Sequence, residues 1–188
     1  ALKSKIFNQV IVSTDSKRIA KIATELGATV PYLRSKKNSN DRATINDVLK
    51  EVILKLRIKE KFVFCIYPTA PLLKVQDLKK GLKKINQRYD QIVAISEYAS
   101  PIQRAFKKIG KSFVKYIDTK YKFYRSQDLE KTYFDTGTFA IYKTNTILKY
   151  KKIKSPKIGY VEIDKYSAID INDDSDFKYA KLIFNLKK

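Results

Sequence analysis

Residues 169–177 read Ile-Asp-Ile-Asn-Asp-Asp-Ser-Asp-Phe, and they place four aspartates in one short segment of a chain whose net charge is +21. The apolar run 160–163 before this segment predicts a strand, and the helical spacing of apolar residues from Phe177 onward predicts a helix. Carboxylates at such a junction either cap the helix and oppose its positive end, or hold a hard cation such as Mg²⁺, which takes oxygen ligands. Asp170 is separate from the others, because it lies at the strand end, where open α/β sheets place their ligand chemistry.

The rest of the chain alternates between apolar runs typical of strands and amphipathic stretches typical of helices. The predicted strands are residues 10–15, 29–31, 62–66, 91–95, 138–142 and 158–163. The predicted helices are residues 17–26, capped by Ser16 and stopped by Gly27, and residues 44–56, 75–85 and 145–150. The run 62–66 is apolar at every position, which predicts a central parallel strand. This alternation predicts an α/β domain with a mostly parallel sheet and right-handed crossovers.

Residues 97–133 interrupt this pattern. Short antiparallel strands are predicted at 105–108, 112–117 and 121–124, with Gly110-Lys111 as a turn. We expect this segment to be an arm inserted into a single domain that spans residues 1–188. Such insertions often serve as lids or as dimerisation arms.

The composition limits the compartment and the partners. Cys65 is the only cysteine, which rules out an internal disulfide, and its place in the apolar run 62–66 predicts a buried, unreactive thiol. No apolar run approaches the ~20 residues of a membrane helix, and no secretory signal pattern opens the chain. We therefore expect a cytoplasmic protein without a membrane partner.

The basic charge is spread along the whole chain, and arginine is scarce beside lysine. Arginine is the residue suited to bidentate phosphate and base contacts. We interpret the charge as a composition bias toward lysine and a solvated surface, without a nucleic-acid partner. A basic nucleic-acid-binding module stays open as an alternative, and it predicts affinity for duplex DNA that falls steeply with salt.

The residue inventory excludes several kinds of catalytic site. The chain has no histidine, which excludes Ser-His-Asp and Cys-His catalysis and, with a single cysteine, a zinc site built on His or several Cys. No GxGxxG or Walker A loop is present. Carboxylates, arginines and polar strand ends remain, and this inventory suits metal-assisted chemistry on phosphates.

Four strand ends carry polar side chains that a parallel sheet would bring to one edge. They are Ser13-Thr14-Asp15, Tyr67-Pro68-Thr69, the turn Asp135-Thr136-Gly137 that leads into Thr138, and Asp170. Each of them, taken singly, is also explained as a turn or a cap. Their joint placement favours a ligand site.

Residues 125–129 (Arg-Ser-Gln-Asp-Leu) and 133–137 (Tyr-Phe-Asp-Thr-Gly) resemble the R-S-Q-D-L…H-D-A-G segment of CMP-pseudaminic acid synthetases, also called pseudaminic acid cytidylyltransferases. Further matches follow in the family's order: residues 10–15 with its second strand, 41–44 with its D-x-A-[ST] nucleotide loop, 100–106 with its S-P-x-R-x-F segment, and 170–172 with the D-I-D metal motif of the wider CMP-sialic acid synthetase group. The resemblance extends from Phe7 to Leu182, nearly the whole chain.

The resemblance implies a Rossmann-like domain of the nucleotide-diphospho-sugar transferase type, in which the inserted arm serves dimerisation. It also implies a reaction: the anomeric hydroxyl of a nine-carbon α-keto acid sugar, pseudaminic acid, attacks the α-phosphate of CTP, and pyrophosphate leaves. The CMP-sugar would serve surface glycan or flagellin glycosylation. A homodimer with shared active sites is expected.

The resemblance further implies candidate site residues. Asp170 would be catalytic and would bind Mg²⁺, and Asn172 would be a further metal ligand where the family has a second aspartate. Because asparagine is neutral, either the metal affinity is lower here or Asp173 or Asp176 compensates. The nucleotide-binding residues would be Ser13, Asp15, Arg42, Ala43 and Thr44. The sugar-binding residues would be Tyr67, Thr69, Arg104, Arg125, Gln127, Asp135, Thr136 and Gly137.

The family opens with a first strand and a basic loop, A-R-x-G-S-K-R-x-x-x-K-N, that cradles the CTP phosphates. This sequence starts at Ala1, lacks that loop and contains no methionine, so we expect that an N-terminal piece is missing. Two further alternatives stay open. In the first, the enzyme acts on N-acetylneuraminate or legionaminate in place of pseudaminic acid. In the second, the chain is a truncated, non-catalytic domain that dimerises or binds a sugar nucleotide.

Overall fold

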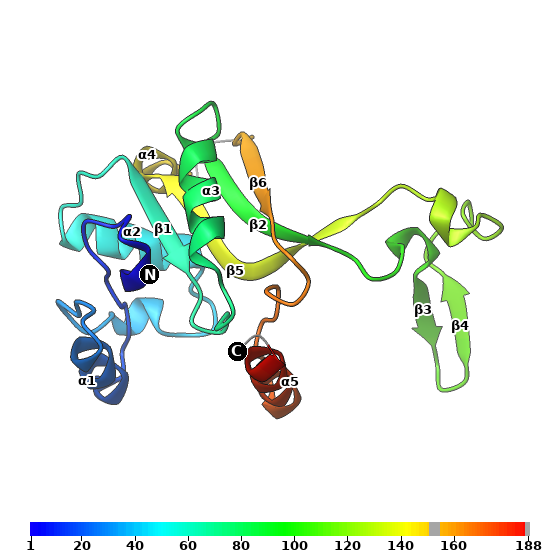
Figure 1. The fold of residues 1–188 in the computed structure, drawn as a ribbon, viewed down its shortest axis with the longest axis horizontal. Helices are drawn as coiled ribbons and strands as arrows, with labels where there is room; N and C mark the ends of the chain where they lie inside the picture. Colours follow the sequence, from blue (N-terminus) through cyan, green and yellow to red (C-terminus); the bar gives the residue numbers. More distant parts are fainter. Residues whose placement is uncertain (151–154, 187–188) are drawn as a thin grey trace.

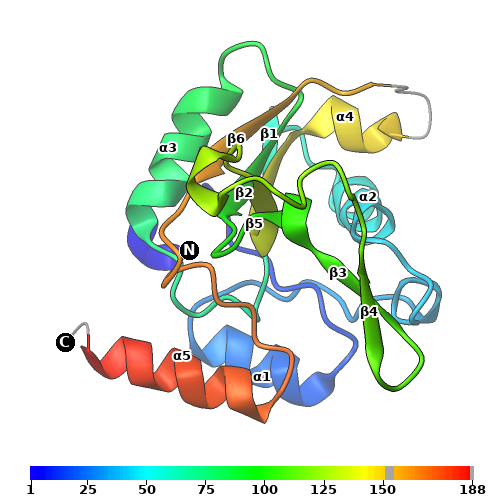
Figure 2. The same cartoon turned by 90° about the vertical axis from the view of Figure 1, so that its right-hand side faces the viewer.

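A four-stranded sheet between two layers of helices forms the body of the protein in this computed structural model, which describes residues 1–150 and 155–186 (Figure 1). The strands are β1 (Phe62–Ile66), β2 (Gln91–Glu97), β5 (Tyr133–Lys143) and β6 (Ile158–Glu162), in the spatial order β1-β5-β2-β6. Helix α3 (Val75–Ile85) covers one face of the sheet, and helices α2 (Ile45–Lys55) and α4 (Thr144–Leu148) cover the other (Figure 2). The arrangement confirms the predicted α/β class.

Strand β5 shows how the apolar pattern builds both layers. Phe139 and Ile141 pack with Leu78 of α3 in the main core. Ala140 and Tyr142 alternate with them and pack against α2 and α4 in a second core. Because successive side chains of a strand point to opposite faces, a strand covered on both faces is apolar at nearly every position.

Three of the four strands run in the same direction, which confirms the mostly parallel sheet. β6 pairs in parallel with β2, while β5 runs antiparallel to β1 and β2 and separates them. The predicted central position of residues 62–66 is wrong, because β1 lies at one edge of the sheet. Its continuous apolar run has another cause. Phe64 packs in the α3 core and Val63 in the α2 core, so both faces of β1 are covered.

The predicted strands at 10–15 and 29–31 are reduced to a single parallel bridge between Ile11 and Thr29. The Val12 N–H donates to the Thr29 carbonyl (2.9 Å), and the Thr29 N–H donates to the Val10 carbonyl (2.8 Å). The prediction is therefore right about the parallel approach of the two segments and wrong about the length of the ladder. This pair is not part of the main sheet.

The first helices begin and end where the sequence predicts. The Ser16 hydroxyl accepts a backbone N–H bond of 3.3 Å at the start of α1 (Lys17–Glu25), and Gly27 follows the helix. Thr44 caps α2 through a capping box with Asp47. These side chains satisfy backbone N–H groups that the first turn of a helix leaves without partners.

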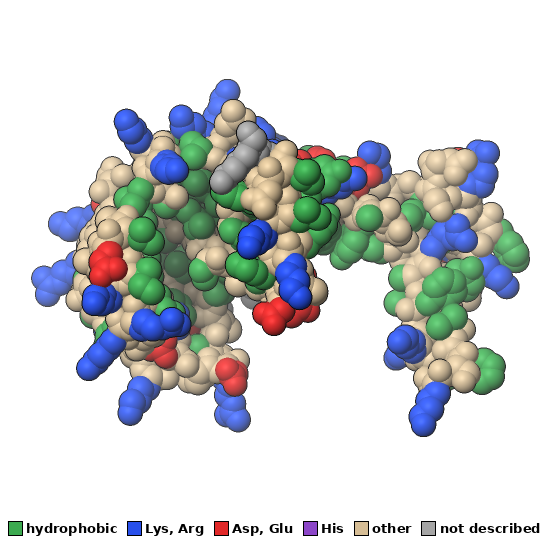
Figure 3. Space-filling model, turned by 60° about the horizontal axis from the view of Figure 1, so that its bottom comes forward, with side chains coloured by type: hydrophobic (Ala, Val, Ile, Leu, Met, Phe, Trp, Pro, Cys, Tyr) green, Lys and Arg blue, Asp and Glu red, His purple; other side chains and the backbone are tan. Residues whose placement is uncertain are grey.

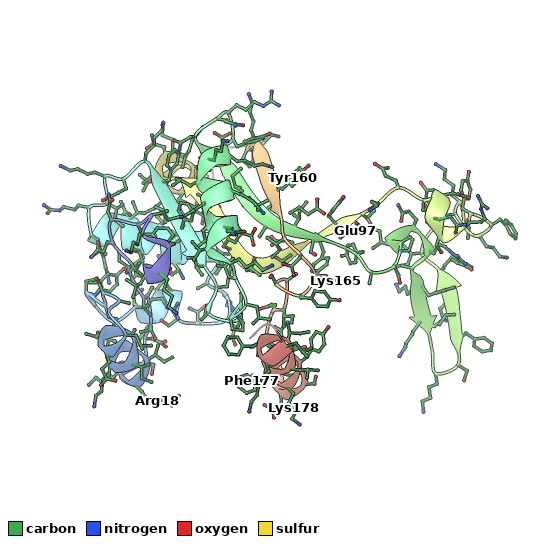
Figure 4. All side chains as sticks on the ribbon, in the orientation of Figure 1. Arg18, Glu97, Tyr160, Lys165, Phe177 and Lys178 are labelled. Carbon is green, nitrogen blue, oxygen red and sulfur yellow. The ribbon has the colours of Figure 1, made fainter. Side chains whose placement is uncertain are left out.

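The arm, defined as residues 97–133, extends away from the body on a ribbon formed by the ends of β2 and β5 (Figure 1). Glu97 is the last residue of β2, at the base of the arm (Figure 4), and its carboxylate forms a 2.9 Å ion pair with Lys131. At the far end, β3 (Phe106–Ile109) and β4 (Phe113–Tyr116) form the predicted antiparallel hairpin.

The predicted third strand of the arm, at 121–124, is wrong. The segment is a turn in which the Tyr124 N–H donates to the Tyr121 carbonyl (3.2 Å). The rings of these two tyrosines lie 5.7 Å apart. The aromatic residues that suggested a strand therefore pack locally within the turn.

The aspartate-rich segment ends in helix α5 (Asp174–Leu186). Asp173 Oδ1 accepts bonds from the Ser175 N–H (2.8 Å) and the Asp176 N–H (2.9 Å), and Asp176 Oδ2 accepts the Asn172 N–H (2.9 Å). Capping is therefore confirmed for Asp173 and Asp176. Over the described ranges, every helix is too short or too polar to span a bilayer.

Candidate active site

A bulge interrupts β5 where the strand passes β2. The register of the pairing shifts between Val93 and Ile95 of β2, and residues 136–139 of β5 lie within the shift. The predicted turn at 135–137 is therefore corrected to a bulge inside a strand. Bulges of this kind are over-represented next to active sites, where they redirect side chains.

Hydrogen bonds hold the bulge in shape. The Thr136 hydroxyl donates to the Ala94 carbonyl (3.0 Å) and lies 2.9 Å from the Thr138 hydroxyl. Asp135 Oδ1 accepts the Gly137 N–H (3.1 Å), and Gly137 has a φ of +59°. Thr136 is buried, so its hydroxyl stabilises the bulge, whereas Asp135 is exposed and open to a ligand.

The segment after β1 and the loop after β6 both meet this bulge. The Tyr67 N–H donates to the Thr138 carbonyl (3.0 Å), and the Ile171 N–H donates to the Thr69 carbonyl (3.0 Å). A Cβ atom built on Gly137 would lie 3.4 Å from Oδ2 of Asp170. Three of the four predicted strand ends therefore come together: residues 67–69, residues 135–137 and Asp170.

Asp170 and Asn172 form the candidate metal position. The Asn172 side-chain amide lies 3.3 Å from Oδ2 of Asp170. Turning that amide over would place its oxygen beside the carboxylate, and one carboxylate with one amide oxygen suits Mg²⁺, which keeps waters and substrate phosphates in its shell. Among residues 1–150 and 155–186, three or more acidic or thiol side chains nowhere gather into a complete metal cluster.

Ser13 and Asp15, the fourth predicted strand end, are joined by Arg34. The Arg34 guanidinium donates to the Ser13 carbonyl (3.5 Å) and lies 3.6 Å from Oδ1 of Asp15. The Arg34 N–H donates to the Thr14 carbonyl (2.8 Å). An arginine side chain is thereby fixed at this strand end.

A cavity of about 660 Å³ is lined by Ser13 and Arg34 of one group, and Tyr67 and Pro68 are the part of the other group that reaches it. Its walls are residues 6–13, α2 and β1, and they include Ser13, Arg34 and Tyr67. The Ser13 hydroxyl is buried there without a hydrogen-bond partner in the described part of the chain. Since buried polar atoms are nearly always satisfied, this hydroxyl is available to a ligand. The volume lies within the range of small-molecule sites.

Arg42, Ala43 and Thr44 form the corner that leads into α2. The Arg42 N–H donates to the Asn40 side chain (2.9 Å), and the Thr44 hydroxyl is engaged with Asp47 in the helix cap. The Arg42 side chain is exposed. The first turns of α2 that follow this corner line the cavity, so the corner lies on its α2 side.

Two tyrosines and one cysteine near the bulge are held in their neutral forms. Burial raises the pKa of Tyr67, and the neighbouring Cys65, Tyr142 and Asp135 raise it further. Burial likewise raises the pKa of Tyr142 to about 12 and that of the Cys65 thiol to about 11. Tyr67 is therefore a neutral hydrogen-bond donor at the cavity. The raised pKa of Cys65 agrees with the predicted unreactive thiol, but the predicted burial is only partial, because Cys65 lines the cavity.

The remaining predicted residues lie on the arm and do not reach this site within one chain (Figure 1). Arg125 forms a bidentate ion pair with Asp128, at 2.7 and 3.0 Å. Arg104 donates to the Ser126 hydroxyl (3.1 Å). Gln127 lies in the same short 3₁₀ helix, Ser126–Asp128. The candidate site residues thus fall into a body group and an arm group.

Comparison with known proteins identifies the family. The family model described as cytidylyltransferase matches residues 1–182. The chain belongs to this family. The predicted enzyme class, a CTP-dependent nucleotidyltransferase, is thereby confirmed.

The proteins that resemble this cytidylyltransferase include cytidylyltransferases and a CMP-sugar synthetase. Over 99% of the chain it is 33% identical to the pseudaminic acid cytidylyltransferase of Campylobacter jejuni serotype O:2, of which it covers 82%. It is 27% identical, over 94% of its length, to an N-acylneuraminate cytidylyltransferase of Streptococcus agalactiae, of which it covers 43%. The fold is that of a solved CMP:2-keto-3-deoxy-manno-octonic acid synthetase, with a TM-score of 0.71 and 11% identity over 100% of this chain and 85% of that one.

Two side chains of this cytidylyltransferase were missed by the interpretation of its sequence. Arg34 holds Ser13 and Asp15 at the cavity. Glu51 on α2 accepts hydrogen bonds from the segment that follows Arg34. The sequence contains no signal that sets either residue apart. Arg34 is one of 40 basic residues in the chain. Glu51 lies in the predicted helix 44–56, where a charged residue is expected on the polar face and does not stand out.

Proposed function

We propose that this cytidylyltransferase transfers CMP from CTP to pseudaminic acid with Mg²⁺ as its cofactor, and that it releases pyrophosphate. The observation that supports the sugar is the 33% identity to the Campylobacter jejuni pseudaminic acid enzyme over 99% of this chain. The convergence of residues 67–69, the β5 bulge and Asp170, with Tyr67 lining the cavity, supports a single reaction centre in the body.

In this proposal the nucleotide occupies the side of the cavity formed by Ser13, Asp15 and residues 42–44. The unpartnered Ser13 hydroxyl is available to a polar atom of the nucleotide. The Arg42 guanidinium is exposed and positioned to meet negative charge on the nucleotide. The apolar side chains of α2 that line the cavity offer a surface for a base.

The sugar occupies the side next to the bulge. Tyr67 offers a neutral hydroxyl, and Asp135 offers a carboxylate that orients a sugar hydroxyl or amide. Thr69, whose carbonyl accepts the Ile171 N–H, and Thr136 and Gly137 of the bulge would form the floor of this part. Gly137 keeps the floor free of a side chain next to Asp170.

Asp170 and Asn172 would hold the metal ion. A bound Mg²⁺ would supply charge neutralisation at the phosphates of CTP. In the transfer, the sugar's anomeric hydroxyl oxygen forms a bond to the α-phosphorus and gives its proton to water, while the bond from the α-phosphorus to the bridging oxygen breaks. The electron pair of the broken bond leaves with pyrophosphate, so atoms and charge balance.

The arm group reaches a site only if a second copy of the chain supplies it, so the proposal includes a homodimer with shared sites. The arm exposes large apolar side chains, and Figure 3 shows hydrophobic surface along it. Phe113 is 74% exposed, Ile117 68% and Phe123 89%. Exposed apolar patches of this kind mark interfaces. Arg104, Arg125 and Gln127 would then meet the carboxylate or acyl groups of the sugar in the partner's body.

We place the reaction in the cytoplasm, where CTP is made, and the CMP-sugar would serve glycosylation of surface glycans or flagellin. A nucleic-acid partner is not part of the proposal. On the face drawn in Figure 3, Lys and Arg side chains are distributed around the body and the arm and do not form one continuous patch.

The test is pyrophosphate release from CTP and Mg²⁺ by the chain as given and by a version extended upstream to an initiator methionine, with pseudaminic acid and N-acetylneuraminic acid offered in parallel and a reaction without sugar as the control. We expect release with pseudaminic acid at least about tenfold faster than with N-acetylneuraminic acid. The reverse preference would favour the second candidate sugar, which the match to the Streptococcus agalactiae enzyme supports. Release with neither sugar would favour a non-catalytic domain.

A further inference from the structure

Glu51 has a largely covered carboxylate that connects a loop to helix α2. Its side chain is 8% exposed and forms a 2.9 Å ion pair with Lys55. It accepts bonds from the Ser35 N–H (3.1 Å) and the Ser35 hydroxyl (2.6 Å), and it contacts the side-chain amide of Asn38. Ser35 and Asn38 belong to the segment between Arg34 and α2, so one carboxylate fixes this segment at several atoms.

A chain of hydrogen bonds continues from Ser35 to the cavity. The Ser39 hydroxyl donates to the Ser35 carbonyl (2.9 Å) and lies 3.2 Å from Nε of Arg34, which donates to it. Arg34 in turn contacts the Ser13 carbonyl and Asp15. The Glu51 carboxylate on α2 is thereby connected through Arg34 to Ser13, and Arg34 and Ser13 both line the cavity.

The charge of Glu51 persists over the working range of an enzyme. Burial by itself would raise the pKa of Glu51, but the hydrogen bonds from Ser35, Lys55 and Asn38 outweigh burial and lower it to about 2. Lys55 also lies over the ring of Tyr32, 4.1 Å from its centre, which limits the motion of the ammonium group. The Glu51 carboxylate is therefore ionised in the folded chain at neutral pH.

We propose that Glu51 is a positioning residue for the nucleotide half of the site. It holds residues 35–39 so that Arg34 and the corner at 42–44 are in place before CTP binds. This inference rests on the proposed function and adds a residue that touches neither substrate. A loop ordered in advance avoids the entropy cost of ordering on binding, so loss of Glu51 weakens the use of CTP and leaves the chemical step nearly unchanged.

The test compares the wild-type chain with Glu51→Gln, Ser35→Ala and the double variant. Glu25→Gln is the matched control, because Glu25 is exposed on α1 and its loss changes the net charge equally. KM and kcat are measured for CTP and for the sugar, and hydrogen–deuterium exchange is measured for peptides that span residues 33–44.

We expect Glu51→Gln to raise KM for CTP about tenfold, with kcat and KM for the sugar changed less than about twofold. Exchange at 33–44 should rise in the same variant and stay at the wild-type rate in Glu25→Gln. Ser35→Ala should show a smaller effect, and the double variant should be no worse than Glu51→Gln, because both changes act on one interaction.

An active wild-type chain with an unchanged KM for CTP in Glu51→Gln would overturn the positioning role alone. Increased exchange without a change in KM would also overturn it, since Glu51 would then only stabilise the fold. A wild-type chain without CTP-dependent turnover would overturn the proposed function and, with it, this role.

Discussion

Gly137 faces Asp170, and a Cβ atom at position 137 would lie 3.4 Å from Oδ2 of the carboxylate, in van der Waals contact with it. Gly137 belongs to the bulge of β5, and Asp170 follows β6, so the contact joins two segments of the sheet that are distant in sequence. With a φ of +59°, Gly137 has a conformation that other residues adopt at a cost. The absence of a side chain therefore serves both the backbone and the space beside Asp170.

The chain contains a matched control for this position. Gly110, in the turn of the arm hairpin, has a φ of +58°, and a Cβ atom there would meet nothing within 4 Å. Alanine at either position should destabilise its local turn by about 1 kcal/mol. We expect only Gly137→Ala to reduce turnover, by about tenfold or more, because only that methyl group touches Asp170. Equal losses in both variants, measured beside their melting temperatures, would show that backbone strain alone is responsible.

Substitutions at Asp170 and Asp174 distinguish the two roles of the aspartate-rich segment, metal binding and stabilisation of the start of α5. Asp174 is exposed in the first turn of α5, where its charge opposes the helix dipole for about 0.3–1 kcal/mol. Asp170→Asn should lower Mg²⁺-dependent turnover at least about a hundredfold while the melting temperature stays close to that of the wild type. Asp174→Asn should show the small loss of stability and nearly full turnover. Full activity of Asp170→Asn at saturating Mg²⁺ would remove Asp170 from the metal position.

The sequence predicted helices better than sheet order, and the reason is local. Ser16, Thr44 and Asp47 cap helices through bonds to residues only three positions away, so the pattern contains the whole interaction. The edge position of β1 depends instead on β5, which follows some 70 residues later and inserts itself antiparallel between β1 and β2. A continuous apolar run records that both faces of a strand are covered, and it does not record which strands lie beside it.

The candidate site likewise contains residues that the local sequence reveals and residues whose roles depend on contacts distant in sequence. Residues 67–69 and Asp170 were found because the ends of strands are visible in the sequence, and the structure brings them together. The bulge at 136–139 was predicted as a turn, because a glycine such as Gly137 is found both in turns between strands and in bulges within a strand. Glu51 is joined to the loop before α2 through Ser35 and Asn38, and no spacing rule connects these positions in the sequence.

A mixing experiment tests whether the arm acts on the partner's body. Asp170→Asn impairs the body group, and Arg125→Ala impairs the arm group, so each variant alone should be inactive or nearly so. If sites are shared, a heterodimer contains one intact site, made of the body of the Arg125→Ala chain and the arm of the Asp170→Asn chain. After the two chains are unfolded, mixed and refolded together, about half of the dimers are mixed, and activity should recover to about a quarter of wild type.

The control for the mixing experiment is Lys107→Ala in place of Arg125→Ala. Lys107 is an exposed residue of β3, outside the predicted sugar-binding set. The Lys107→Ala chain should be active by itself and show no requirement for a partner. Failure of Asp170→Asn and Arg125→Ala to complement each other, with dimers demonstrated by sedimentation, would mean that the arm serves its own body or neither.

Glu51 gives the fold an acid-sensitive interaction whose sign follows from its pKa. The free carboxyl has a pKa of 4.5, and folding lowers the pKa of Glu51 to about 2. The folded state therefore favours the ionised form. Its stabilisation is complete above the higher value and is lost as the pH falls toward the lower one. Glu51→Gln lacks this titration, so the free energies of unfolding of the two proteins should converge in acid.

Urea unfolding of the wild type and of Glu51→Gln measures this convergence. The difference in the free energy of unfolding should be on the order of 2 kcal/mol at neutral pH and less than about half of that near pH 3. Other carboxylates whose pKa is lowered, such as Asp90, titrate in both proteins and cancel in the comparison. A difference that stays constant with pH would mean that the variant acts through packing, and that the bonds from Ser35 and Asn38 do not depend on the charge of Glu51.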